Sequence, residues 1–143
     1  MSKFNLHSLK EKFLLEVYNR CSLAGKRRII SFLRKNNSLS LLSKRANFRG
    51  KFQVKIPKNN YFYMINYGGI IEERTLRDGL FKTWENDIGW IWVQLCKCSD
   101  VVFDVGANTG IYSLVTKSIN PNASVYAFEP SPRNFKKLRK NNY

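Results

Sequence analysis

The stretch from Val101 to Glu129 constrains the fold more than any other part of the chain. It opens with an apolar run, Val101 to Phe103, of the β-branched and aromatic residues typical of a parallel strand buried on both faces. A glycine-bearing turn, Asp104 to Gly110, comes next, followed by apolar residues at helical spacing and a second apolar run, Ser124 to Phe128. This order predicts a βαβ unit with two parallel strands.

The turn is suited to a closely bound ligand. Gly106 and Gly110 lack a Cβ, and Asn108 tolerates left-handed backbone, so the main chain can approach a ligand closely. Glu129 ends the second strand nineteen residues after Gly110. In nucleotide-binding βαβ units an acidic residue at this place meets the ribose hydroxyls. We therefore expect a nucleoside between the turn and Glu129.

Two classes of nucleotide compete for this site. A dinucleotide site uses G-x-G-x-x-G, whereas Gly106 and Gly110 are spaced G-x-x-x-G, and Asp104 would repel a pyrophosphate. The same carboxylate would attract an ammonium group, with an energy of about 4 kcal/mol at 4 Å before desolvation is counted. S-adenosylmethionine carries a ribose and an ammonium group and no phosphate. The residues therefore favour S-adenosylmethionine.

Several separated motifs resemble those of a known family. They are DVGANTG at 104–110, FEPSP at 128–132, the stretch 134–138 after it and GLFKTWE at 79–85. In this order they resemble the FkbM-type S-adenosylmethionine-dependent methyltransferases, a branch of the class I, Rossmann-like methyltransferases. The resemblance runs from Tyr61 to the end of the chain. Asn108 stands where many class I enzymes have a third glycine, but the FkbM pattern has Asn there.

The resemblance implies a cofactor site and an activity. The loop would wrap the methionine end of S-adenosylmethionine, Asp104 would touch the cofactor and Glu129 would take both ribose hydroxyls. The cofactor residues expected on this basis are Asp104, Gly106, Ala107, Asn108, Gly110 and Glu129. The implied reaction is methyl transfer to an oxygen of a sugar, polysaccharide or polyketide-like acceptor. No catalytic base is identifiable, so the catalytic residues are unknown.

The expected fold is α/β: an incomplete Rossmann-like domain after a basic helical region and a β-hairpin. We divide it into 1–49 (basic helical), 50–83 (hairpin and connection) and 84–143 (first part of the cofactor domain). A sheet of this kind needs about six strands, and the chain supplies two. We therefore expect a truncated copy or the first part of a longer protein. The alternative is a non-catalytic remnant or a basic surface-binding fragment.

Residues before the cofactor domain predict short elements. Phe4 to Cys21 has the pattern of an amphipathic helix that packs on the body of the protein or lies on a membrane surface. Lys26 to Lys35 predicts a short basic helix, and 36–49 a linker. The runs 52–56 and 61–65 predict a hairpin.

Two further helices flank the βαβ unit. The first has its apolar residues at helical spacing and should pack on the sheet; they are Trp84, Ile88, Ile91, Trp92 and Leu95. Glu85 at its start suits either the helix dipole or the amino group of the cofactor. The second begins with Ser131 as N-cap and Pro132 in its first turn.

The positive charge is concentrated in the first part of the chain. The net charge is +15; residues 1–60 hold 15 Lys/Arg against two acidic residues, and residues 61–143 hold 10 against eight. This surplus fits a solvated surface, weak contact with an anionic membrane face, or an acidic substrate. Nucleic acid is disfavoured because no aromatic residues alternate with the basic ones in the linker.

Other site classes find little support. The three cysteines have no CxxC spacing and His7 is the single histidine, which argues against a metal site and a disulfide framework. No run reaches the ~20 apolar residues of a membrane span, and the start lacks a signal-peptide pattern. We therefore expect a cytoplasmic protein without a transmembrane segment. The sequence leaves the oligomeric state open.

Overall fold

The computed structural model of the chain describes residues 13–35, 48–56, 59–81 and 85–141. The chain forms two compact units, Met1–Gly50 and Lys51–Tyr143, and each is described by itself. The predicted domain boundaries, between residues 49 and 50 and between residues 83 and 84, stay predictions.

The first unit is helical in its described part. Residues 13–20 form a helix, followed by α2 (Leu23–Lys35). Tyr18, Ile30 and Phe48 are buried. A helix is confirmed over 13–20, but Phe13, Leu14 and Val17 of its predicted apolar face are exposed. The first part of the predicted helix and the linker 36–47 lie outside the described residues.

A hairpin and a short helix open the second unit. β1 (Gly50–Lys55) and β2 (Tyr61–Asn66) are neighbours in a two-stranded sheet, and the N–H of Ile56 donates to the carbonyl of Asn60 at 2.8 Å where the strands meet. Burial alternates along both strands, as expected for a sheet with one covered face. α4 (Ile70–Asp78) packs on β2. The predicted hairpin is confirmed.

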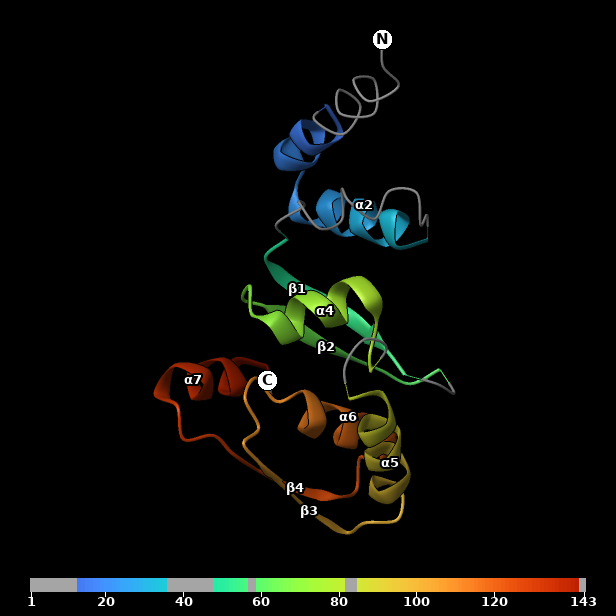
Figure 1. The fold of residues 1–143 in the computed structure, drawn as a ribbon, viewed down its shortest axis with the longest axis vertical. Helices are drawn as coiled ribbons and strands as arrows, with labels where there is room; N and C mark the ends of the chain where they lie inside the picture. The colour runs from blue at the N-terminus through green and yellow to red at the C-terminus, as the bar shows by residue number, and fades with distance from the viewer. Residues whose placement is uncertain (1–12, 36–47, 57–58, 82–84, 142–143) are drawn as a thin grey trace. The chain divides into compact units, whose positions relative to one another are not determined.

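The βαβ unit has the predicted order of elements. β3 (Val101–Val105) pairs in parallel with β4 (Ser124–Phe128), with α6 (Ile111–Ile119) between them in sequence. α6 contacts both β4 and β2, so it lies between the parallel strands and the hairpin (Figure 1). α7 (Pro132–Asn141) begins at the proline, as predicted, and also contacts β2.

The expected burial of β3 on both faces is wrong. Val102 and Asp104 are buried, whereas Phe103 is 60% and Val105 80% exposed. Among the described elements, α6 packs against this sheet from one side. The apolar side chains on the other face of the sheet are exposed to solvent.

The orientation predicted for the tryptophan-containing helix also differs. α5 (Asn86–Cys96) packs against α6, and its buried residues are Gly89, Val93 and Cys96. Three of the predicted core residues point outward and are about 60% exposed: Ile88, Ile91 and Leu95. Trp92, also predicted to be buried, is half-buried and its Nε1 donates to the Oγ1 of Thr116 on α6 at 2.9 Å. Trp84 lies outside the described residues.

Candidate functional site

The turn after β3 has the left-handed backbone that its sequence predicts. The φ angles are 81° at Gly106, 51° at Asn108 and 89° at Gly110. The N–H groups of Gly106 and Ala107 both donate to the carbonyl of Phe128 at 2.9 Å. The loop is therefore held over the carboxyl end of β4, which is where Glu129 begins.

Glu129 is hydrogen-bonded to this loop. Its Oε2 accepts from the N–H of Asn108 at 2.8 Å, and its Oε1 accepts from the N–H of Ser131 at 2.9 Å. A carboxylate has about four lone-pair sites, and these two bonds use about half of them. The half-buried carboxylate is thus fixed in direction and keeps capacity for two further donors, the number that a ribose diol offers.

Asp104 lies beneath the start of α6. Its side chain is 5% exposed, and Oδ2 accepts from both the N–H and the Oγ of Ser113, at 3.0 and 2.6 Å. Asp104 pairs with Ala127 in the strand register, so both acidic residues stand near the same ends of neighbouring strands. Ser113 was not predicted, because a serine inside a helical pattern carries no recognisable signal.

The loop leaves room for a ligand at its first glycine. A Cβ built on Gly106 would meet nothing within 4 Å. In addition, the hydroxyl of Thr109 is buried without a hydrogen-bond partner among the described residues. The loop thus combines open backbone at Gly106 with an oriented carboxylate at Glu129, while the second carboxylate, Asp104, is buried beneath α6.

Asn141 connects the loop to the hairpin. Its Oδ1 accepts from the N–H of Ile65 at 2.8 Å, and its Nδ2 donates to the carbonyl of Thr109 at 2.7 Å. The side chain is 6% exposed. The last turn of α7 thereby fixes the loop against β2. Asn141 was not predicted, because an Asn near a helix end is usually a cap.

An aromatic cluster lies beside the start of α6. The ring of Tyr112 stacks on Phe81 at 5.6 Å and meets Trp92 edge-on at 5.0 Å between centroids. Its hydroxyl donates to the carboxylate of Glu85. Burial, followed by the hydrogen bond to Glu85, raises the pKa of Tyr112 above its usual value.

Glu85 lies at the start of α5, as expected. It occupies the N-cap position of α5 with a φ of 52°, but its side chain makes no capping hydrogen bond. The carboxylate is directed to Tyr112 instead. This hydrogen bond therefore connects the start of α5 to Tyr112 of α6, two residues after Gly110.

The described residues include three cysteines, which bear on other classes of site. Cys21, Cys96 and Cys98 are all free thiols. No group of three or more His, Cys, Asp or Glu side chains that could hold a metal ion occurs in the described ranges. None of the described helices combines the length and the apolar character needed to cross a bilayer.

Comparison with known proteins gives one partial match. A segment of 42 residues is 52% identical to the "31-O-demethyl-FK506 methyltransferase FkbM" of Streptomyces tacrolimicus. Part of this chain is therefore FkbM-like. The matching segment makes up 29% of this chain and 16% of the relative, so it covers about a sixth of that protein. No family model and no solved structure matches the chain.

Proposed function

We propose that the chain is part of an FkbM-type, S-adenosylmethionine-dependent methyltransferase. The methyl acceptor would be a hydroxyl oxygen of a sugar, polysaccharide or polyketide-like compound. The name of the relative describes a methyltransferase that acts on 31-O-demethyl-FK506. This name supports an oxygen atom as the methyl acceptor. The observation that carries the proposal is the bond from Asn108 in the glycine loop to the oriented carboxylate of Glu129.

Each acidic residue has a separate role in the proposed site. Glu129 accepts hydrogen bonds from both ribose hydroxyls with the lone pairs that Asn108 and Ser131 leave free. Asp104 offers its Oδ1 to the α-ammonium, while Oδ2 stays on Ser113. Gly106, Ala107 and Gly110 form the backbone surface for the methionine end.

When bound, the cofactor supplies an electrophilic methyl group on sulfur. The residues of this chain bind and orient that group, because such a displacement depends mainly on in-line positioning and on removal of the acceptor proton. We assign no catalytic base within the described residues. We place β3 and β4 as neighbouring strands of a Rossmann-like sheet, whose ligands lie at the carboxyl ends of the strands. Three free thiols favour a cytoplasmic location.

Calorimetry on the purified chain tests the cofactor assignment. We expect S-adenosylmethionine and S-adenosylhomocysteine to bind, and Glu129→Gln to weaken both by about 10- to 100-fold. This estimate follows from the ~1.5–3 kcal/mol that hydrogen bonds to a charged group contribute. Asp87→Asn removes an exposed acidic group from the first turn of α5 and should leave the affinity unchanged.

Three outcomes would contradict the proposal. A folded chain that binds neither compound would support a non-catalytic remnant. Equal loss in Glu129→Gln and Asp87→Asn would indicate general charge attraction. Tight binding of NAD would assign the site to a dinucleotide.

A further inference from the structure

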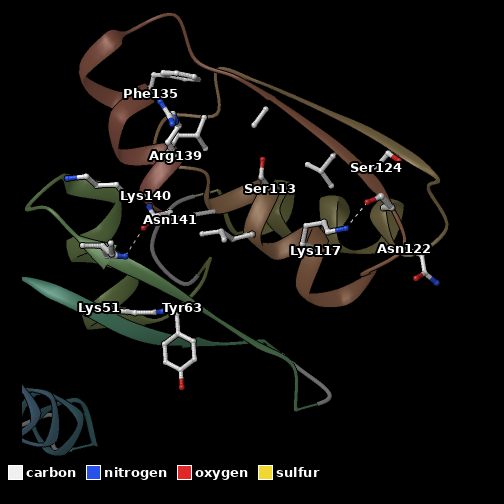
Figure 2. A pocket seen from close by; sticks show the side chains of 16 residues that line it. Lys51, Tyr63, Ser113, Lys117, Asn122, Ser124, Phe135, Arg139, Lys140 and Asn141 are labelled. Atoms are coloured by element: carbon white, nitrogen blue, oxygen red, sulfur yellow. Dashed lines mark hydrogen bonds between the residues drawn. The ribbon is translucent and has the colours of Figure 1, made fainter. Parts of the chain in front are cut away.

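An open hollow of about 820 Å³ lies between the hairpin, α6, the loop before β4 and α7 (Figure 2). Its lining contains four cationic side chains and, among the described residues that form it, no Asp or Glu. The four cations are Lys51, Lys117, Arg139 and Lys140. No loop residue from 104 to 110 lines the hollow, nor does Glu129. The hollow is therefore distinct from the proposed cofactor site but adjoins it through Ser113 and Asn141.

Lys117 is held in place by neutral groups. Its Nζ donates to the carbonyls of Pro121 and Ala123, at 2.5 and 3.0 Å. Carbonyl oxygens orient the ammonium without neutralising its charge, and an ammonium has three N–H donors. One donor of Lys117 therefore stays available at the edge of the hollow.

The other three cations come from two different elements. Lys51 on β1 has its Nζ 5.1 Å from the ring centroid of Tyr63. Arg139 and Lys140 are exposed side chains in the last turn of α7. None of the four forms an ion pair with a carboxylate in the described part of the chain. Like charges that line the same hollow favour entry of an anion.

We propose that this hollow binds a small organic phosphate, preferably one that carries a diphosphate group. Arg139 offers a planar fork for two phosphate oxygens, while the lysines act as point charges. A volume of about 820 Å³ lies within the ~300–1,000 Å³ of small-ligand sites. The ring of Phe135, 43% exposed in the lining, adds an apolar surface for the organic part.

Matched pairs of variants on two elements test the site. On α7, Arg139→Gln/Lys140→Gln removes two lining charges, and Arg133→Gln/Lys136→Gln removes two exposed charges outside the lining. On β1, Lys51→Gln is matched by Lys55→Gln, which also lies outside it. Titration calorimetry would use pyrophosphate and uridine diphosphate as probes, with uridine as the neutral control.

We expect both phosphates to bind and uridine to give no heat. Each lining variant should weaken binding roughly tenfold or more, and each matched variant less than about threefold. Affinity should fall as salt is raised. Equal weakening in lining and matched variants would overturn the proposal, because the effect would then be general surface charge. Absence of phosphate binding by a chain that shows a cooperative melt would overturn it as well.

Discussion

At the scale of single residues, the glycine loop is held by side chains that each make two hydrogen bonds. Glu129 accepts from Asn108 and Ser131. Asn141 joins the carbonyl of Thr109 to the N–H of Ile65. These bonds pair backbone groups of the loop and its neighbours with side chains, so the loop conformation depends on residues far from it in sequence.

Replacement of Asn141 by Ala should affect both stability and cofactor affinity. Loss of two buried hydrogen bonds costs about 1–3 kcal/mol in free energy of unfolding. Asn120→Ala is a matched control, because Asn120 donates to the carbonyls of Cys96 and Ser99 at the other end of α6. We expect similar losses in chemical denaturation. In calorimetry only Asn141→Ala should weaken S-adenosylmethionine binding, by several-fold. Equal affinity in the two variants would show that Asn141 does not position the loop.

Because of Tyr112, the free energy of unfolding should fall at high pH. Its pKa is raised in the folded chain, mainly by burial, so the folded state keeps its proton at a pH where the unfolded tyrosine releases it. This contribution is complete below the unfolded pKa of about 10 and is lost as the pH rises above it. Tyr112→Phe should flatten the decline in unfolding free energy above pH 10. Tyr67, whose pKa burial also raises, accounts for part of the remaining slope. An unchanged slope in Tyr112→Phe would contradict the assignment.

At the scale of elements, the packing of α5 depends on Gly89. A Cβ on Gly89 would lie 2.3 Å from the ring of Phe81, so this ring packs flat on the helix only because Gly89 lacks a side chain. Phe81 has a positive φ of 56° and stacks on Tyr112 of α6. The aromatic cluster therefore determines which face of α5 is buried.

Gly89→Ala separates helix propensity from packing. Propensity alone predicts a gain of about 0.5–1 kcal/mol for Gly to Ala in a helix. The clash with Phe81 predicts a loss of about 1–3 kcal/mol, as for other overpacked sites. We expect the loss to dominate in thermal or chemical unfolding. Gln94→Ala on the exposed face of α5 is the control and should change stability little. A Gly89→Ala variant that is more stable than the parent chain would show that Phe81 does not pack against Gly89.

At the scale of the whole molecule, the parallel sheet exposes one apolar face. Phe103 stacks on Tyr126 and Phe128, with ring centroids 5.4 and 6.1 Å apart, and all three are at least half exposed. Contiguous apolar patches of this kind promote association. β3 and β4 form a two-stranded sheet, so in the described chain its outer edges are also open to pairing.

We expect the purified chain to self-associate through this face. Phe103→Thr/Phe128→Thr should lower the average mass in sedimentation velocity at equal concentration. Ile88→Thr/Ile91→Thr removes the same number of exposed apolar side chains from α5 and serves as the control. Because threonine is compatible with strands, circular dichroism should be unchanged in the first variant. A monomeric parent chain, or equal effects of the two pairs, would contradict this expectation.

The amino-acid sequence by itself determined the βαβ unit. Apolar runs at 101–103 and 124–128, the glycines at 106 and 110 and the proline at 132 act through local backbone preferences, so strands, turn and helix start could be predicted. The proximity of Glu129 to the loop follows as well, because parallel neighbours end at the same edge.

Tertiary structure alone decided which faces are buried and what holds the loop. The outward position of Ile88 and the exposure of Phe103 depend on which elements pack nearby, a property that periodicity does not contain. The bonds of Asn141 to Thr109 and Ile65 join residues 32 and 76 positions apart. The cationic hollow likewise combines Lys51 with Arg139. Such contacts arise only from the packing of hairpin, helix and loop against one another.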